Sequence, residues 1–227
     1  MKKVLFVCEG STEVFLLYKI LEKELSMTIN EELKNNGNLV LKNINGVLTL
    51  FAEKGQLVIY VENLDGESNL IKYTNELCDS REFEEISHIL FIMDADYKAG
   101  DESGFSRTEK AIKKAERMIK KCDNEKLISF FITPNNESDG MTENILVEAV
   151  ECKEITSYIK GEVIPKICEM DGNEMTNKDK STFMMVAATQ NPLRGTASSF
   201  ISSCYNKLDK DSEYLKKLII FIKSNLE

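Results

Sequence analysis

The chain has 227 residues, of which 42% are hydrophobic and 30% are charged, and its formal net charge is −9. This composition is typical of a globular protein, and the length suits one domain with a sizeable core. The acidic balance argues against non-specific nucleic-acid binding over the whole surface, although one local basic face can still contact phosphates.

The six cysteines form no C-x-x-C pair, so the sequence suggests no zinc site. Free thiols in a reducing compartment are the simplest interpretation. The apolar run after Met1 is short and ends at Glu9, unlike a signal peptide, and no stretch approaches the ~18 apolar residues of a membrane span. We therefore expect a cytoplasmic protein that makes no membrane contact.

Strand and helix patterns alternate over the first two thirds of the chain. Apolar or β-branched runs predict strands over residues 3–8, 39–41, 56–62, 87–93 and 127–132. Helical spacing of apolar residues predicts helices over about 12–26, 68–78 and 106–121, the last opening with a capping box from Ser106 to Glu109. Residues 47–55 are ambiguous. This alternation predicts an α/β fold with a mostly parallel sheet flanked by helices.

The last third of the chain carries only helical patterns. One helix begins near Thr142, and others are expected over 153–169, 178–190, 195–206 and 211–225. We therefore expect an α/β domain over residues 1–150 and a C-terminal helical extension over residues 151–227, packed on the same domain.

Two of the predicted strands end abruptly in carboxylates. Glu9 follows the apolar run 4–8, and Asp94 and Asp96 follow the run 89–93. Continuous apolar runs indicate parallel strands buried on both faces, and ligands bind beyond the carboxyl ends of such strands. In an extended segment, Asp94 and Asp96 point to the same side of the strand. The three carboxylates are therefore expected at one rim of the sheet.

Glu143 is a fourth acidic candidate, since it lies in the first turn of a helix just beyond the strand 127–132. Carboxylates gathered at one rim repel one another unless a cation joins them. A hard divalent ion with oxygen ligands, Mg²⁺ or Mn²⁺, suits such a set. The sequence thus predicts a metal site formed by Glu9, Asp94, Asp96 and Glu143.

Residues that favour a phosphate surround these carboxylates. Gly10 allows close approach, and the amides of Ser11 and Thr12 at a helix N-terminus favour an anion. Gly66 lies in a loop that we expect to open at the same rim, and Lys98 follows the D-x-D pair.

One face of the helix 106–121 is basic. It carries Lys110, Lys113, Lys114, Arg117, Lys120 and Lys121. A solvated face opposite the buried one is one interpretation, and a surface that contacts phosphates is the other.

These motifs resemble the TOPRIM domain, the metal-binding α/β module of topoisomerases, primases and recombination proteins. They are most similar to its variant in the overcoming-lysogenization-defect (OLD) nucleases and in small stand-alone relatives. The matching residues are Glu9-Gly10 with Glu13 close behind, then Asp94-Ala95-Asp96, then Pro134, Gly140 and Glu143. The resemblance covers about residues 3–150 and leaves the helical extension outside it.

The resemblance implies a TOPRIM-like, Rossmannoid fold with Glu9, Asp94 and Asp96 as metal-handling catalytic residues. Glu9 would also serve as a general acid or base, and Glu143 would join the metal shell. OLD nucleases use a basic residue late in the domain, for which Lys180 or Arg194 is a candidate. The chain has no ATPase P-loop, so a partner ATPase would be a separate protein. The family's glycine soon after D-x-D is displaced, to Gly100 at best.

Three functions fit these observations. The first is a Mg²⁺-dependent nuclease or other phosphodiester-processing protein acting on nucleic acid. The second is a non-catalytic TOPRIM-like module that binds metal, nucleic acid or a partner protein. The third is a nucleotide-sugar transferase that uses the D-x-D pair, an interpretation that leaves Glu9 without a role.

Overall fold

The structure is a computed structural model that describes residues 2–29, 50–54, 57–98, 100–150, 152–171, 175, 177–190 and 195–227. The strand expected over 39–41 and the candidate Arg194 lie outside these residues.

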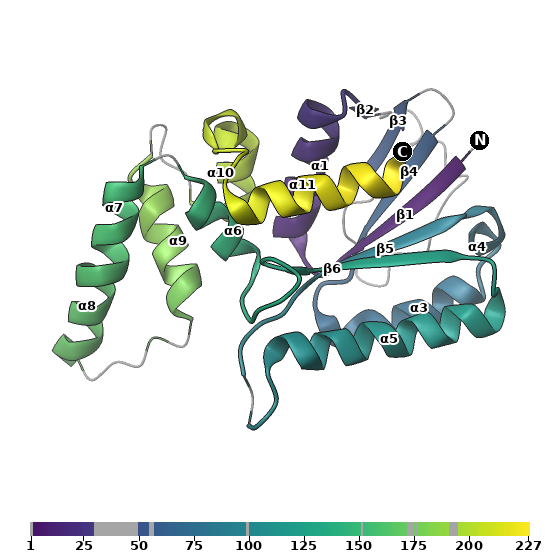
Figure 1. Cartoon of the computed structure of the whole chain (residues 1–227), viewed down its shortest axis with the longest axis horizontal. Coiled ribbons are helices and arrows are strands. Elements are labelled where there is room, and N and C mark those ends of the chain that lie inside the picture. The colour runs from purple at the N-terminus through teal and green to yellow at the C-terminus, as the bar shows by residue number, and fades with distance from the viewer. Residues whose placement is uncertain are drawn as a thin grey trace.

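Six strands of the described residues form one sheet, in the order β2-β3-β4-β1-β5-β6 (Figure 1). They are β1 (Lys2–Cys8), β2 (Thr28–Ile29), β3 (Leu50–Lys54), β4 (Leu57–Asn63), β5 (His88–Asp94) and β6 (Leu127–Thr133). Strands β4, β1, β5 and β6 are parallel, while β3 and β2 add an antiparallel edge. The predicted α/β fold with a mostly parallel sheet is therefore confirmed, and the ambiguous region contains strand β3.

The central strands β1 and β5 contain long apolar runs because both of their faces are covered. In β1, Val4, Phe6 and Cys8 join the hydrophobic cluster on one face of the sheet, and Leu5 and Val7 join the cluster on the other. This alternation follows from the period of two along a strand. It explains why the sequence shows a continuous apolar run instead of an alternating pattern.

Helices cover both faces of the sheet. Helices α3 (Leu70–Cys78), α4 (Glu82–Glu85) and α5 (Gly104–Cys122) lie on one face, with a 3₁₀ turn over Glu67–Asn69 before α3. The other face is covered by α1 (Ser11–Glu24), α10 (Ala197–Cys204) and α11 (Glu213–Leu226), and α6 (Thr142–Ala149) and α9 (Lys178–Ala188) continue the same hydrophobic cluster to one side of the sheet. Figure 1 shows α11, in yellow, on the side of the sheet away from α3 and α5.

The helices expected after residue 150 are all present. Helix α7 (Lys153–Tyr158), a π-helical turn over Ile159–Val163 and α8 (Ile164–Asp171) form one continuous helical stretch, and α9 to α11 follow. Phe183 and Leu215 belong to the same buried cluster as Val4 of the sheet, and the ring of Phe221 lies 5.5 Å from that of Phe131. The extension therefore shares one hydrophobic core with the sheet. None of the described helices is both long and apolar enough to cross a lipid bilayer.

Helix α5 begins two residues earlier than the capping-box motif predicts. Its N-cap is Ser103, whose hydroxyl accepts the backbone N–H of Ser106 at 3.1 Å. Gly104 packs on the chain after β5, because a Cβ atom there would lie 2.2 Å from the carbonyl oxygen of Ala95. Both serines suit a cap, and this backbone contact sets the actual start.

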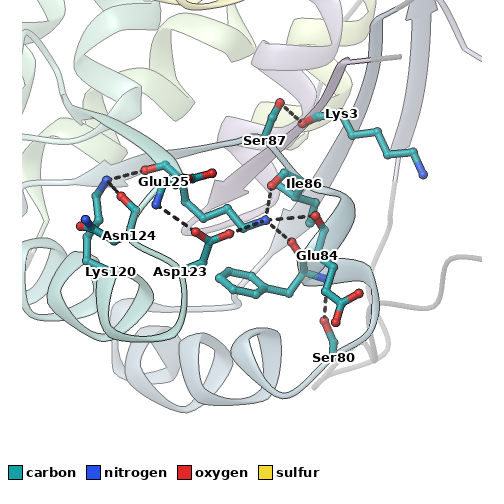
Figure 2. A network of polar contacts seen from close by, with 11 residues as sticks. Lys3, Ser80, Glu84, Ile86, Ser87, Lys120, Asp123, Asn124 and Glu125 are labelled. Carbon is teal, nitrogen blue, oxygen red and sulfur yellow. Dashed lines mark hydrogen bonds and ion pairs between the residues drawn. The ribbon is translucent and has the colours of Figure 1, made fainter.

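A buried lysine, Lys126, stabilises the region just before β6, the edge strand of the sheet. The Lys126 ammonium is 5% exposed and donates to the carbonyl oxygens of Phe83 at 2.6 Å, Ile86 at 2.7 Å and Glu84 at 3.2 Å. The Asp123 carboxylate lies 3.3 Å away and balances its charge. Figure 2 shows Glu84, Ile86 and Asp123 gathered in this network. The ammonium thereby ties the end of α4 to the start of β6.

Candidate functional site

Glu9 and Asp94 meet at the carboxyl ends of two adjacent parallel strands. In the β1–β5 register, Cys8 lies beside Ile92, and the Glu9 amide continues the ladder to the Ile92 carbonyl at 3.0 Å. The Glu9 side chain then turns toward β5, where its Oε2 accepts the backbone N–H of Asp94 at 3.0 Å. The structure thus brings together the residues that end the two apolar runs.

The Asp94 carboxylate is fixed by threonines from two other elements. Its Oδ1 accepts the Thr133 hydroxyl at 2.6 Å, the Thr142 amide at 2.9 Å and the Thr142 hydroxyl at 3.0 Å. Among the described residues none donates to Oδ2. Burial and repulsion from Glu143 raise the pKa of Asp94 to about 6, although these hydrogen bonds oppose the rise.

The pKa of Glu9 is raised further, to about 8. Burial is the largest cause, and the nearby charges of Asp94, Asp96 and Glu67 add to it, while the hydrogen bond from the Asp94 amide acts in the opposite direction. The Glu9 side chain therefore exchanges its proton close to neutral pH, which is the range a general acid or base needs.

Glu13 lies beside Glu9 and Asp94, although it was not among the predicted site residues. We call these three side chains the carboxylate cluster. Glu13 is 4% exposed, and its Oε2 accepts the backbone N–H of Gly10 at 2.8 Å. Burial and the charges of Asp94 and Glu9 raise its pKa well above the ordinary value. The sequence signal was its place four residues after Glu9, one helical turn into α1, which points it back toward the strand end.

Asp96 departs from the geometry expected for a D-x-D pair. Strand β5 ends at Asp94, and Asp96 has a left-handed backbone with φ of 57°. Its carbonyl accepts the Gly140 amide at 2.8 Å, and Gly104 packs against its backbone. The prediction that Asp94 and Asp96 point to the same side of one extended segment is therefore wrong. Asp96 still lies close enough to Glu9 to raise the pKa of that carboxyl.

Two positively charged side chains lie close to the outer carboxylates, Asp96 and Glu143. Arg107 of α5 lies 3.6 Å from Asp96 and 3.8 Å from Glu67. On the other side, the Lys180 ammonium of α9 lies 3.8 Å from the buried Glu143 carboxylate. The structure therefore brings Lys180 next to Glu143, one of the predicted metal ligands, and its role stays a prediction.

The N-terminal end of α9 makes two further contacts near the site. The Tyr97 hydroxyl, in the loop after Asp96, donates to Asp179, and the Asn177 amide approaches the Met141 sulfur at 3.4 Å. The helical extension thus packs beside the carboxyl ends of the strands, where Glu9, Asp94 and Asp96 lie; we call this edge of the sheet the carboxylate rim.

The other phosphate candidates differ in their positions. Gly66, with a left-handed φ of 114°, donates its N–H to the Glu9 carbonyl at 2.9 Å, so its loop does open at this rim. The Gly10 amide is occupied by Glu13, and Ser11 and Thr12 form the first turn of α1 beside it. Lys98 is exposed and pairs with no carboxylate among the described residues, so the structure does not bring it into the cluster.

The described carboxylates are not arranged as a complete set of ligands for one metal ion. The described part of the chain contains no group of three histidine, cysteine, aspartate or glutamate side chains placed to hold one ion. Metal binding therefore stays a prediction, and it requires at least one of these side chains to turn toward the others.

Thr133, Thr142 and Arg107 were also missed from the sequence. Thr133 lies opposite Asp94 in the β5–β6 register, so it is the polar residue that ends β6 just as Asp94 ends β5. Thr142 immediately precedes Glu143, and its hydroxyl and amide both reach Asp94 because it opens α6. Arg107 carried no site signal, since its position depends on where α5 begins.

Comparison with known proteins gives a family. The sequence model described as "Protein of unknown function (DUF3226)" matches residues 2–227. The chain belongs to the DUF3226 family. A search of curated proteins finds no match for this DUF3226 chain. It is similar in structure to a crystallised hypothetical protein from Pyrococcus horikoshii OT3, with a TM-score of 0.59 and 15% identity over 100% of this chain and 95% of that one. At this identity the likeness concerns the fold alone.

Proposed function

We propose that this DUF3226 protein is a TOPRIM-type, Mg²⁺- or Mn²⁺-dependent protein that processes phosphodiester bonds in nucleic acid. One observation carries the proposal: Glu9 and Asp94 follow and end two adjacent parallel strands, Glu13 of α1 lies beside them, and no described cation forms an ion pair with any of the three. Such buried carboxyl groups are costly to ionise, as their raised pKa values show, and a bound cation would lower that cost.

The donor set suits a hard divalent ion. Carboxylate oxygens are the ligands that Mg²⁺ and Mn²⁺ prefer, and the described cluster offers no thiolate or imidazole ligand. Asp94, Glu9 and Glu13 would hold the ion, and Asp96 and Glu143 would join after parting from Arg107 and Lys180. A divalent ion bound there supplies charge stabilisation to a phosphoryl group.

The protein's own residues divide the remaining tasks. Thr133 and Thr142 hold the Asp94 carboxylate in one orientation. Glu9, whose pKa is about 8 in the metal-free protein, would lose its proton when it holds the ion, and it can act as a general acid or base only when it leaves the metal shell. Arg107 and Lys180, which lie beside Asp96 and Glu143, would contact phosphates of the substrate.

The experiment that tests this proposal measures both cleavage of nucleic acid and binding of the metal ion. Labelled single- and double-stranded DNA and RNA are incubated with Mg²⁺ or Mn²⁺, and metal affinity is measured by calorimetry. The variant is Asp94→Asn, and the matched control is Asp79→Asn, an exposed carboxylate at the end of α3. We expect the wild type and Asp79→Asn to bind metal and cleave, and Asp94→Asn to do neither. Equal cleavage by Asp94→Asn, or a wild type that binds no metal, would overturn the proposal.

A second function has one observation in its favour. The described carboxylates form no ready-made metal group, and Lys180 and Arg107 already neutralise two of the outer ones. A non-catalytic module that binds metal or nucleic acid without turnover fits this arrangement. Metal binding that depends on Asp94, without cleavage of any substrate, would favour it.

A further inference from the structure

Five positively charged side chains lie on one side of helix α5, on its outer surface, and we call this set the α5 stripe. They are Arg107, Lys110, Lys114, Arg117 and Lys121. Their spacing of three or four residues puts them on one side of the helix. The buried side chains of α5, including Ile112, Ala115 and Ile119, lie on the opposite side, against the sheet. The stripe therefore faces away from the core.

Three of the five stripe residues have no acidic partner among the described residues. Lys114, Arg117 and Lys121 are exposed and form no ion pair with any residue that the structure describes. Toward the N-terminal end, Lys110 pairs with Glu102, and Arg107 has only the longer contacts to Asp96 and Glu67. In a chain with a net charge of −9, three unpaired cations in a row are a local exception.

The acidic residues of α5 lie on a different side of the helix from the α5 stripe. Glu109 pairs with Lys113 at 2.7 Å, and Glu116 lies seven residues further along on the same flank. The flank thus carries the negative charges, and the stripe itself is uninterrupted.

The stripe also leads to the carboxylate rim. Arg107, its first member, is 3.6 Å from Asp96, while Lys121 lies at the far end of α5, near the start of β6. Fourteen residues at the helical rise correspond to about 21 Å. At 3.4 Å per base pair, this length matches about six base pairs of a duplex. Figure 1 shows α5 along the outer side of the molecule, below the sheet.

We propose that the α5 stripe binds the sugar–phosphate backbone of a nucleic acid and leads it to the carboxylate rim. The direction of this path rests on the proposed function, whereas the binding itself needs neither metal nor cleavage. A basic helix that binds a membrane surface inserts apolar side chains beside its cations. The apolar side of α5 is buried against the sheet, so a nucleic acid fits this surface better than a lipid surface does.

The experiment compares two triple variants that change the net charge equally. The stripe variant is Lys114→Gln/Arg117→Gln/Lys121→Gln, and the control is Lys160→Gln/Lys166→Gln/Lys216→Gln, three exposed lysines of the helical extension. Fluorescence anisotropy with short labelled DNA duplexes, single strands and RNA is recorded in EDTA over a range of salt concentrations. Anionic phosphatidylserine vesicles serve as the competing polyanion. Circular dichroism checks that both variants are folded.

We expect the stripe variant to bind nucleic acid at least about tenfold more weakly, and its salt-dependence slope to fall by about three. The control should stay within about twofold of the wild type. Equal weakening of both variants, no nucleic-acid binding by the wild type, or stripe-dependent binding to vesicles alone would each overturn the proposal. Stripe-dependent binding without cleavage would leave it standing while the proposed function fails. Cleavage that depends on Asp94, with unchanged binding in the stripe variant, would show the reverse.

Discussion

The Glu9 carboxylate accepts the backbone amide of Asp94 at 3.0 Å, so one acidic residue is anchored on the strand end that carries another. The contact places two carboxylates side by side where burial raises the pKa of both. Ionising the two side chains therefore lowers the stability of the folded state, and this arrangement and its supports can be tested in four ways.

The first prediction concerns pH. Glu9, with a pKa of about 8, and Asp94, with a pKa of about 6, are both raised above their ordinary values of 4.5 and 3.8. The folded state then binds more protons than the unfolded state, so the stability these groups contribute is complete below about pH 4 and is lost as pH rises through 6 and 8. We expect the metal-free free energy of unfolding to fall by roughly 5 kcal/mol between pH 5 and pH 9.

Urea unfolding in EDTA across this pH range measures the effect. Glu9→Gln should remove the part of the decline near pH 8, and added Mg²⁺ should restore stability on the alkaline side. A metal-free stability that is flat or rises from pH 6 to pH 8.5 would contradict the assignment.

The second prediction concerns Arg107. Its guanidinium lies 3.6 Å from Asp96 and repels any cation that approaches the cluster. Arg107→Gln should therefore tighten Mn²⁺ binding by roughly two- to fivefold, as expected for one unit charge in a solvent-exposed setting. Calorimetric titration measures this change. Arg117→Gln, with the same charge change on the same helix but further from the site, should leave the metal affinity as it is. If the two variants shift it equally, Arg107 has no specific effect on the ion.

The third prediction concerns Gly104. A Cβ atom there would lie 2.2 Å from the Ala95 carbonyl oxygen and 2.7 Å from the carbonyl carbon of Asp96, so α5 must move. We expect Gly104→Ala to cost about 2–4 kcal/mol of stability and to weaken metal binding. Gly161 is a matched helical glycine where an added Cβ atom would meet nothing within 4 Å, and Gly161→Ala should be neutral or slightly stabilising. Thermal unfolding of the two variants side by side decides the matter.

The fourth prediction concerns Lys126, far from the site. Lys126→Met removes the donor that satisfies the carbonyls of Phe83 and Ile86 and leaves the Asp123 carboxylate without its partner. The free energy of unfolding should fall by about 2–4 kcal/mol, while metal affinity is retained. Lys121→Met, an exposed lysine nearby, should change stability by less than about 0.5 kcal/mol. Comparable losses in the two variants would mean that the buried network stabilises nothing beyond an ordinary surface charge.

The fold was largely predictable because its central strands are buried on both faces. The continuous apolar runs before Glu9 and Asp94 identify β1 and β5, and helical spacing identifies α1, α5 and α11. Strand β2 was missed because two residues are too few to show a period. The start of α5 was misplaced because the deciding contact, between Gly104 and the Ala95 carbonyl, joins segments nine residues apart.

The candidate site was predictable only in its strand-end residues. Glu9 and Asp94 were found because parallel strands end at one rim. The orientation of Asp96 was not, since it follows from the bond with Gly140 and the packing of Gly104, neither of which has a sequence period. Arg107 was missed as a site residue for a similar reason, because tertiary packing brings it to Asp96.

The helical extension has a consequence for the order in which the site forms during translation. Helix α11, the C-terminal element, packs on α6 and β6, the two elements whose threonines hold Asp94. Glu9 and Asp94 leave the ribosome long before α11 does. A nascent chain that has not yet exposed α11 already contains Thr133 and Thr142, but the two elements that carry them lack the helix that packs on them. We therefore expect the Asp94 carboxylate to be held less firmly until α11 docks on α6 and β6.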